Sequence, residues 1–456
     1  MLVNRRSSVP TLPTSPLHYP ELHERVRRQA ELLPELYGDL DFDTQPYRTT
    51  TNPDDVSSLR GRPSTRAKLL ADEAAVELIS TATWLGDVVS DSYAALMGQY
   101  SVSTLISMLK LACRNGIDAV PDAPPELAAF IADMEATPDW LDMDLVREGA
   151  EHSRIPMALL APFVVRGAFI ATFLNTYAAL PMALTGALSG NRAARRVNET
   201  TSFFAVTTLP GALDRYGPGF EAAAMVRLMH SMVRFNALKR SPKWDVEVYG
   251  LPIPQLDQMP AGMINLYLLA MDARRQGRTD FTPSERAVVE FTRYRCVLLG
   301  LPEELLPTTP GEIIRVLSAR SAMLRDDFDD ATCGELVRST MAAYLRQEDT
   351  MRERIADAVE KSYSKFFFVR MFAGGKRAVA AKMGVTLGAG DYLRMALTAP
   401  FVYGRVLVVQ RAVHTPGLRR ITNAYVLRLL KRRLKAYGTA EYTSDVAEYT
   451  PSGRAA

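Results

Sequence analysis

The chain is poor in the residues that most often bind metals or act as nucleophiles. Its 456 residues include three cysteines and five histidines. Cys113, Cys296 and Cys333 are far apart in the sequence, which argues against a disulfide framework and a cysteine-based zinc site and favours an intracellular location. The run Cys-x-x-Cys-His is absent, so a covalently attached c-type haem is excluded.

Several catalytic motifs are missing as well. The sequence has no Glu-x-x-His pair, no His-Glu-x-x-His helix, no Gly-x-Ser-x-Gly elbow and no complete Walker A loop. These absences argue against a di-iron bundle, a zinc metalloprotease, an α/β-hydrolase and a P-loop nucleotidase.

The charge balance and the N-terminal sequence exclude two further classes. The 54 basic and 51 acidic side chains give a net charge of +3, which is too small to imply a nucleic-acid partner. Arg5 and Arg6 could begin a twin-arginine export signal, but residues 7–20 contain four prolines and no apolar segment. We therefore expect a cytoplasmic protein that binds no nucleic acid.

What the sequence does contain is helical periodicity. Hydrophobic residues make up 47% of the chain and charged residues 23%, as in ordinary globular proteins. We expect an irregular N-terminal arm over residues 1–65, a helical core over 66–310, and a helical extension over 311–456 that ends in a disordered tail. Before the apolar centre of the chain, the pattern predicts helices at Glu21–Leu36, Ala71–Leu85, Tyr93–Arg114, Pro125–Glu135 and Leu145–Ser153. The fold class is therefore all-α.

A long apolar stretch runs over residues 155–188, and its second half, residues 167–190, contains no charge. That length could cross a bilayer. Arg166, several prolines and a group of polar residues near Asn175 favour one or two buried helices instead, which could form the wall of a tunnel for a hydrophobic substrate.

His230 lies in a helical frame that suits haem binding. Arg227 at i−3 and Arg234 at i+4 share its helix face, and apolar residues surround it. A buried neutral imidazole is a common axial ligand of haem iron, and guanidinium groups are good partners for propionates. The simpler alternative is a core histidine between two surface arginines.

A wider set of residues resembles the latex-clearing-protein and MpaB oxygenase family. The similarity covers roughly residues 66–310. It rests on Arg196, Glu199, Thr200, Gly219-Phe220, Arg227–Arg234, Trp244-Asp245, Gly250–Gln255, Phe281–Arg286 and Leu298–Leu306. The resemblance implies a globin-like all-α core that binds haem b, with His230 as the proximal iron ligand and Arg196 and Thr200 on the distal side. In rubber-cleaving members a lysine stands at the position of Glu199, so this chain departs from the rubber-cleaving pattern there.

The spacing of the distal candidates allows them to act together. On a helix, Glu199 and Thr200 lie at i+3 and i+4 from Arg196, so all three can share one face. Arg196 and Thr200 can donate hydrogen bonds to negative charge that develops on an oxygen substrate. Glu199 can act as a base toward an allylic proton or can orient Arg196, and we favour the orienting role. The alternative for all three is a helix-capping cluster with a surface salt bridge.

Basic residues gather in the last third of the chain. Residues 365–370 and a predicted helix at Tyr425–Tyr437 could contact an anionic membrane surface, although a solvated helix face is the simpler interpretation. Together these features predict a haem-dependent oxygenase that uses O2 on a lipophilic, isoprenoid-like or other alkene substrate. The alternative is a non-catalytic helical protein that holds haem or a lipid at a membrane surface.

Overall fold

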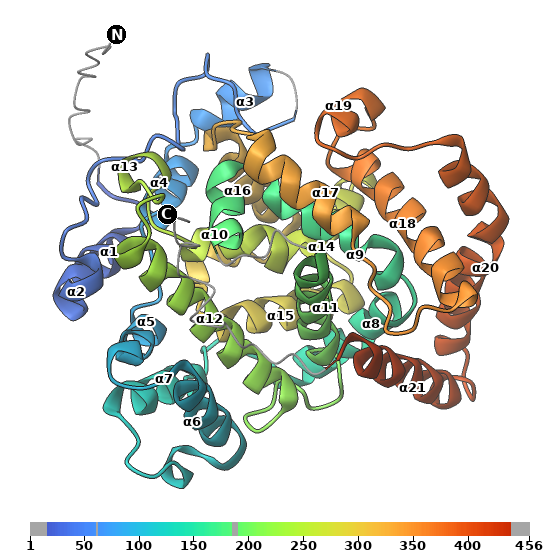
Figure 1. Cartoon of the computed structure of the whole chain (residues 1–456), viewed down its shortest axis with the longest axis horizontal. Helices are drawn as coiled ribbons and strands as arrows, with labels where there is room; N and C mark the ends of the chain where they lie inside the picture. The colour runs from blue at the N-terminus through green and yellow to red at the C-terminus, as the bar shows by residue number, and fades with distance from the viewer. Residues whose placement is uncertain (1–15, 61–62, 185–189, 439–456) are drawn as a thin grey trace, which may run out of the picture.

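The structure is a computed structural model that describes residues 16–60, 63–184 and 190–438. Figure 1 shows an all-α molecule. Within the described ranges, the extended pairing is limited to two isolated bridges, Thr49 with Leu324 and Ser57 with Arg325. The prediction of an all-α fold is therefore confirmed.

The N-terminal segment is part of the folded core. Over the described part of the predicted arm, two helices carry Leu22, Val26, Leu36 and Tyr37 into the main hydrophobic core. The segment is thus more regular than its composition indicated. The helices of this third of the chain are α1 (Pro20–Leu32), α2 (Pro34–Tyr37), α3 (Pro63–Leu70), α4 (Glu73–Ala82), α5 (Val88–Ala95), α6 (Val102–Asn115) and α7 (Pro125–Glu135).

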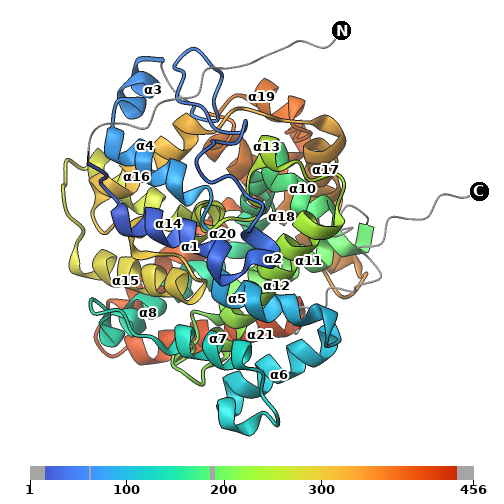
Figure 2. The ribbon, with the colours of Figure 1, turned by 90° about the vertical axis from the view of Figure 1, so that its left-hand side faces the viewer.

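The middle third contributes the helices at the centre of the molecule. They are α8 (Met143–Leu159), α9 (Ala161–Ile170), α10 (Thr176–Leu184), α11 (Gly190–Val206), α12 (Pro218–Arg240), α13 (Val246–Tyr249), α14 (Gln255–Arg275) and α15 (Pro283–Leu298). Figures 1 and 2 show α5 beside α12, which is buried over most of its length. A helix with so little exposed surface has to satisfy its charged side chains inside the protein.

The apolar stretch is divided among several short helices. Helices α8 and α9 meet at a bend of 92° next to Leu160, and the chain breaks again between α9 and α10. Asn175, at the second break, donates a 2.6 Å hydrogen bond to the carbonyl of Arg325. Over residues 167–184 the chain therefore forms the end of α9, a short 3-10 turn and then α10, and residues 185–189 lie outside the described ranges.

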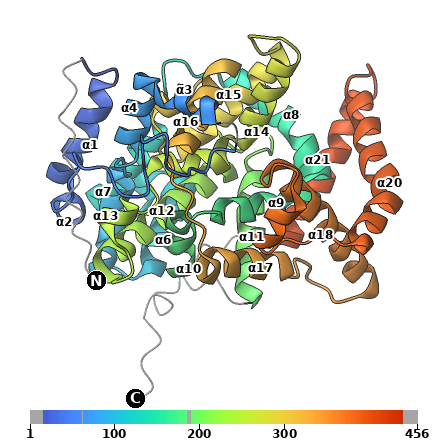
Figure 3. The ribbon, with the colours of Figure 1, turned by 90° about the horizontal axis from the view of Figure 1, so that it is seen from above.

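The C-terminal third packs on one side of this centre. Its helices are α16 (Pro310–Met323), α17 (Glu335–Ala342), α18 (Met351–Met371), α19 (Arg377–Lys382), α20 (Ala389–Val413) and α21 (Arg419–Tyr437). Figure 3 shows α20 and α21 at the edge opposite α1 and α2. Smaller hydrophobic clusters, separate from the main core, join α20 and α21 to α8, and α18 to α9 and α17.

Gly300, just after α15, allows three chain segments to meet. Its φ of +86° is in the region that favours glycine. A Cβ at this position would lie 2.8 Å from Nε2 of Gln255, 3.0 Å from Oδ2 of Asp87 and 3.1 Å from Nε of Arg227. Only glycine combines this backbone conformation with so close an approach.

We therefore predict that Gly300→Ala lowers the free energy of unfolding by about 3 kcal/mol, because backbone strain adds to displacement of buried polar groups. Chemical denaturation would measure the loss. Gly277→Ala is the matched control, since Gly277 also has a positive φ of +75° but has no atom within 4 Å of the added Cβ. The control should lose only about 1 kcal/mol. Equal losses for the two variants would show that the close contacts at Gly300 are unimportant.

Candidate functional site

Helix α12 is held to α5 by a buried ion pair on one side of His230. Arg227 donates from Nε and Nη2 to the two carboxylate oxygens of Asp87, at 2.8 and 2.7 Å. Its remaining Nη1 donates to Asp133 on α7 at 2.8 Å. Asp87 is also the N-cap of α5, accepting from the backbone of Ser90. Burial opposes ionisation of Asp87, but the paired guanidinium of Arg227 lowers the pKa of this carboxyl below its ordinary value.

A second buried ion pair lies on the other side of His230. Arg234, which is fully buried, pairs with the fully buried carboxylate of Asp91 on α5, and Tyr37 of α2 donates to the same carboxylate. Arg234 also donates to the carbonyls of Pro252 at 3.0 Å and Ile253 at 2.5 Å. Ile253 has a φ of +47°, which is strained for a β-branched residue.

These pairs change the interpretation of the two arginines. We had expected Arg227 and Arg234 to bind haem propionates, but both guanidinium groups are directed to carboxylates and carbonyls of the protein itself. Releasing either arginine would leave a buried carboxylate without its partner, which is costly. Their geometry therefore fits the positioning of α12 and does not fit the binding of haem propionates.

His230 itself presents a neutral imidazole. The residue is half-buried, while its Nδ1 atom is fully buried and has no hydrogen-bond partner among the described residues. Burial, and then the positive charge of Arg234, lower the pKa of His230 to about 4. At neutral pH the ring is therefore uncharged and keeps the lone pair that a metal ion needs.

Gln258, on α14, is a neighbour of His230 that the sequence interpretation missed. Its side chain is close enough to raise the pKa of His230, which partly offsets the effect of burial. The side chains of Gln258 and His230 nevertheless do not form a hydrogen bond of normal geometry. The amide nitrogen donates to Gln255, while the amide oxygen is buried without a partner among the described residues. One signal in the sequence could have pointed to Gln258: it lies three residues after the motif Gly250–Gln255, which ends where α14 begins.

The three residues expected on the distal side share one face of α11, as their spacing predicted. Glu199 is buried and pairs through one oxygen with Arg195 at 2.9 Å and through the other with Arg196 at 3.5 Å. Arg196 Nη1 also lies 3.3 Å from the sulfur of Met229, the residue directly before His230. Thr200 is half-buried, one turn after Arg196. The fold thus brings Arg196, which pairs with Glu199, against the helix that carries His230.

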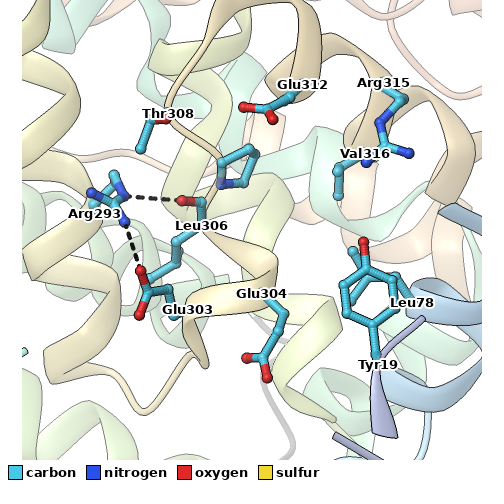
Figure 4. A pocket seen from close by; sticks show the side chains of 11 residues that line it. Tyr19, Leu78, Arg293, Glu303, Glu304, Leu306, Thr308, Glu312, Arg315 and Val316 are labelled. Carbon is cyan, nitrogen blue, oxygen red and sulfur yellow. Dashed lines mark hydrogen bonds and ion pairs between the residues drawn. The ribbon is translucent and has the colours of Figure 1, made fainter. Parts of the chain in front are cut away.

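No three His, Cys, Asp or Glu side chains lie close enough together to hold a metal ion within the part of the chain that the structure describes. Figure 4 shows a pocket elsewhere, between α1, α4, α15 and α16. Its lining includes Arg293, Arg315, Glu303, Glu304 and Glu312, and none of the six predicted site residues. Such a charged lining does not suit a lipophilic substrate.

The candidate residues of α11 and α12 lie in a part of the chain that matches a known family. Residues 156–403 match the family described as the catalytic domain of ER-bound oxygenase mpaB/B' and rubber oxygenase. The chain belongs to this family. The matched region includes α10, α11 and α12, and thus His230 and the Arg196 cluster. The match begins and ends later than the inferred region of similarity, residues 66–310, and it reaches residue 403 within α20.

The fold agrees with a known structure of the same family. Latex clearing protein in its closed state superposes with a TM-score of 0.54 at 17% sequence identity, covering 78% of this chain and 92% of that one. At this identity the similarity establishes the fold alone. No curated protein matches the chain.

We predict that Asp87→Asn lowers stability at neutral pH by about 3–5 kcal/mol, because Arg227 would stay buried beside a neutral amide. The pKa of Asp87 is lowered in the folded state, so its stabilising effect is present above the ordinary aspartate pKa and is lost as pH falls below about 4. The variant should therefore lose less stability on acidification than the wild type.

Urea titrations from neutral to acidic pH would test both parts of this prediction. Asp272→Asn is the control, because Asp272 forms an exposed pair with Arg275 at 3.2 Å. Its cost should stay below about 1 kcal/mol at every pH. A loss at Asp87 no larger than that of the control would mean that the α12–α5 pair does not position the helix.

Proposed function

We propose that this protein is a b-type haem-dependent oxygenase that acts on a lipophilic alkene, isoprenoid-like or of another kind. The observation that carries the proposal is the joint placement of a neutral imidazole, His230, and the Arg196–Glu199 pair on two adjacent helices of an oxygenase family domain. Each feature occurs in proteins without cofactors, but together they would supply an iron ligand and a polar cluster on the adjacent helix.

The chemistry of the site fits haem better than a bare metal ion. A protein that binds a metal ion with its own side chains usually offers three or four ligands, whereas His230 offers one. Haem iron needs only an axial ligand because the porphyrin supplies four nitrogens. Haem bound at His230 would supply the binding and activation of O2.

The remaining site residues would control charge and orientation. Arg196 can donate hydrogen bonds to negative charge that develops beside the cofactor, and Thr200, one turn away, can add a second donor. Both oxygens of Glu199 face guanidinium groups, which supports an orienting role over a role as a base. Because the resembled rubber-cleaving proteins have a lysine at the position of Glu199, we propose a substrate other than rubber.

Gln258 would position His230. When Nε2 of the histidine binds iron, Nδ1 carries the proton and needs an acceptor, and the buried amide oxygen of Gln258 is the neighbouring group without a partner. A hydrogen bond from Nδ1 to this oxygen would give both buried atoms a partner. The bond would fix the ring orientation and make the ligand more basic.

We predict that His230→Ala abolishes stoichiometric haem binding, because the axial ligand is lost. The absorption spectrum and a pyridine haemochrome assay would measure haem type and content after expression with haem supply. His152→Ala is the control, since His152 is a half-buried residue that pairs with Glu148 at 3.3 Å, and it should bind haem as the wild type does. Urea midpoints would show that both variants are folded.

Two outcomes would contradict the proposal. Full haem retention in His230→Ala with an unchanged spectrum would exclude this residue as the ligand. A haem-loaded wild type that consumes no oxygen with a range of lipophilic alkenes would favour the non-catalytic alternative.

A second prediction concerns Gln258. In the reduced, haem-loaded protein, Gln258→Leu should lower the iron–histidine stretching frequency in the resonance Raman spectrum, and Gln258→Glu should raise it, because ligand basicity follows the strength of the acceptor. Haem affinity should fall roughly 10–100-fold in the leucine variant. An unchanged frequency in both variants would show that Gln258 does not contact the ligand, whatever their stability.

A further inference from the structure

Helix α20 exposes an apolar face to solvent. Five of its large apolar side chains form the group that we call the α20 face: Leu393 (61% exposed), Leu397 (66%), Phe401 (77%), Leu407 (55%) and Val408 (67%). Four of them recur at intervals of four, four and seven residues, so they lie along one side of the helix. Tyr392 and Tyr403 are exposed beside them. A continuous apolar row of this kind is unusual on a soluble surface.

The opposite side of α20 is fixed to the protein. Val406, Val409 and Val413 are buried in a cluster shared with α8 and α21. At the start of the helix, Asp391 accepts a 2.8 Å hydrogen bond from Ser362 of α18. The exposed row is therefore the outer side of a helix that is packed in place, at the edge of the molecule seen in Figures 1 and 3.

The charged residues of the chain segment from Tyr392 to Gly438 have one sign. From Tyr392 to Gly438 the chain has no aspartate or glutamate, while it has ten lysines and arginines. Because the whole chain has a net charge of only +3, the rest of the protein is net negative. The exposed basic residues of this segment are Arg405, Arg411, Arg419, Arg420, Arg428, Lys431, Arg432 and Lys435. This segregation favours an anionic partner on this side alone.

We propose that the protein docks on an anionic lipid bilayer through the α20 face, with the basic residues of α21 and the α20–α21 turn contacting the headgroups. Apolar side chains next to tyrosines and arginines are the pattern of helices that lie in the membrane interface. Helix α20 is long and apolar enough to cross a bilayer, and 17% of its most apolar window is buried. Its packed inner side and the charge of Arg405 favour a position parallel to the membrane over a crossing one.

The proposal stands apart from haem binding, because it rests on the exposed surface and on charge. Docking would place the enzyme at the surface where lipophilic molecules dissolve. The sequence interpretation considered membrane contact through residues 365–370 and 425–437. The structure adds the apolar α20 face that links these basic segments.

The full-length protein should co-sediment with vesicles of phosphatidylcholine and phosphatidylglycerol, and should bind phosphatidylcholine alone much more weakly. Leu397→Ser/Phe401→Ser/Val408→Ser should weaken binding at least about tenfold, because three large apolar side chains are lost from the interface. Lys431→Gln/Arg432→Gln/Lys435→Gln should weaken it by roughly fivefold for each charge removed, and added salt should do the same.

Met351→Ser/Ile355→Ser is the matched control. Both side chains are exposed apolar residues of α18, at 71% and 58%, outside the α20 face, so this variant should bind vesicles like the wild type. Circular dichroism and thermal melting should be unchanged in every variant, since the altered side chains are exposed.

Four outcomes would overturn the proposal. The first is failure of the wild type to bind anionic vesicles. The second is binding by the Leu397/Phe401/Val408 variant that equals binding by the wild type, and the third is a loss of binding in the Met351/Ile355 control as large as in that variant. The fourth is resistance of the membrane-bound protein to an alkaline carbonate wash, which would indicate a spanning helix. A dimer in solution that the α20 variant dissociates, without vesicle binding, would instead assign the face to a second copy of the chain.

Discussion

The position of His230 depends on the two buried arginine–aspartate pairs that join α12 to α5. Arg227 and Arg234 lie three residues before and four residues after the histidine, so their pairs fix both the rotation and the axial position of the helix at that point. Removing these charges from water has an energetic cost that offsets much of the attraction within each pair. A hydrophobic contact of the same size would therefore stabilise the fold to at least a similar degree. What the pairs provide is a single register, because each guanidinium group meets a carboxylate in only one arrangement of the two helices.

A second buried network does the same for the neighbouring helix. Asp257, near the start of α14, accepts from Arg48 at 2.6 Å and from Arg320 of α16 at 2.8 Å, and Arg320 also donates to Tyr177 of α10 at 2.7 Å. Gln258 is the next residue after Asp257. His230 and Gln258 are thus each positioned by buried ion pairs of their own helix. The partners in these ion pairs and their hydrogen bonds come from segments between α2 and α16.

The sequence predicted what local patterns determine. Helix α7 has the predicted bounds, Pro125–Glu135, because its proline start and its apolar spacing are both local. Residues 93–114 were expected to form one helix, but the chain breaks before Ser101, whose side chain caps the backbone of Thr104. The functions of Arg227 and Arg234 could not be predicted, since the carboxylates that bind them are 94 to 143 residues away in sequence. The sequence also does not predict which side of α20 is exposed. Both sides of the helix are apolar, and only the packing shows which one is covered.

The strained backbone of Ile253 makes the positions of His230 and Gln258 interdependent. Its left-handed conformation turns the carbonyl toward Arg234, and that hydrogen bond helps to hold the conformation in place. Two residues later α14 begins, and Gln258 follows within its first turn. A shift of α12 that weakened the Arg234 contact would let Ile253 relax and would displace the start of α14. A change in the position of α12 would then be transmitted to the start of α14, so His230 and Gln258 would move together.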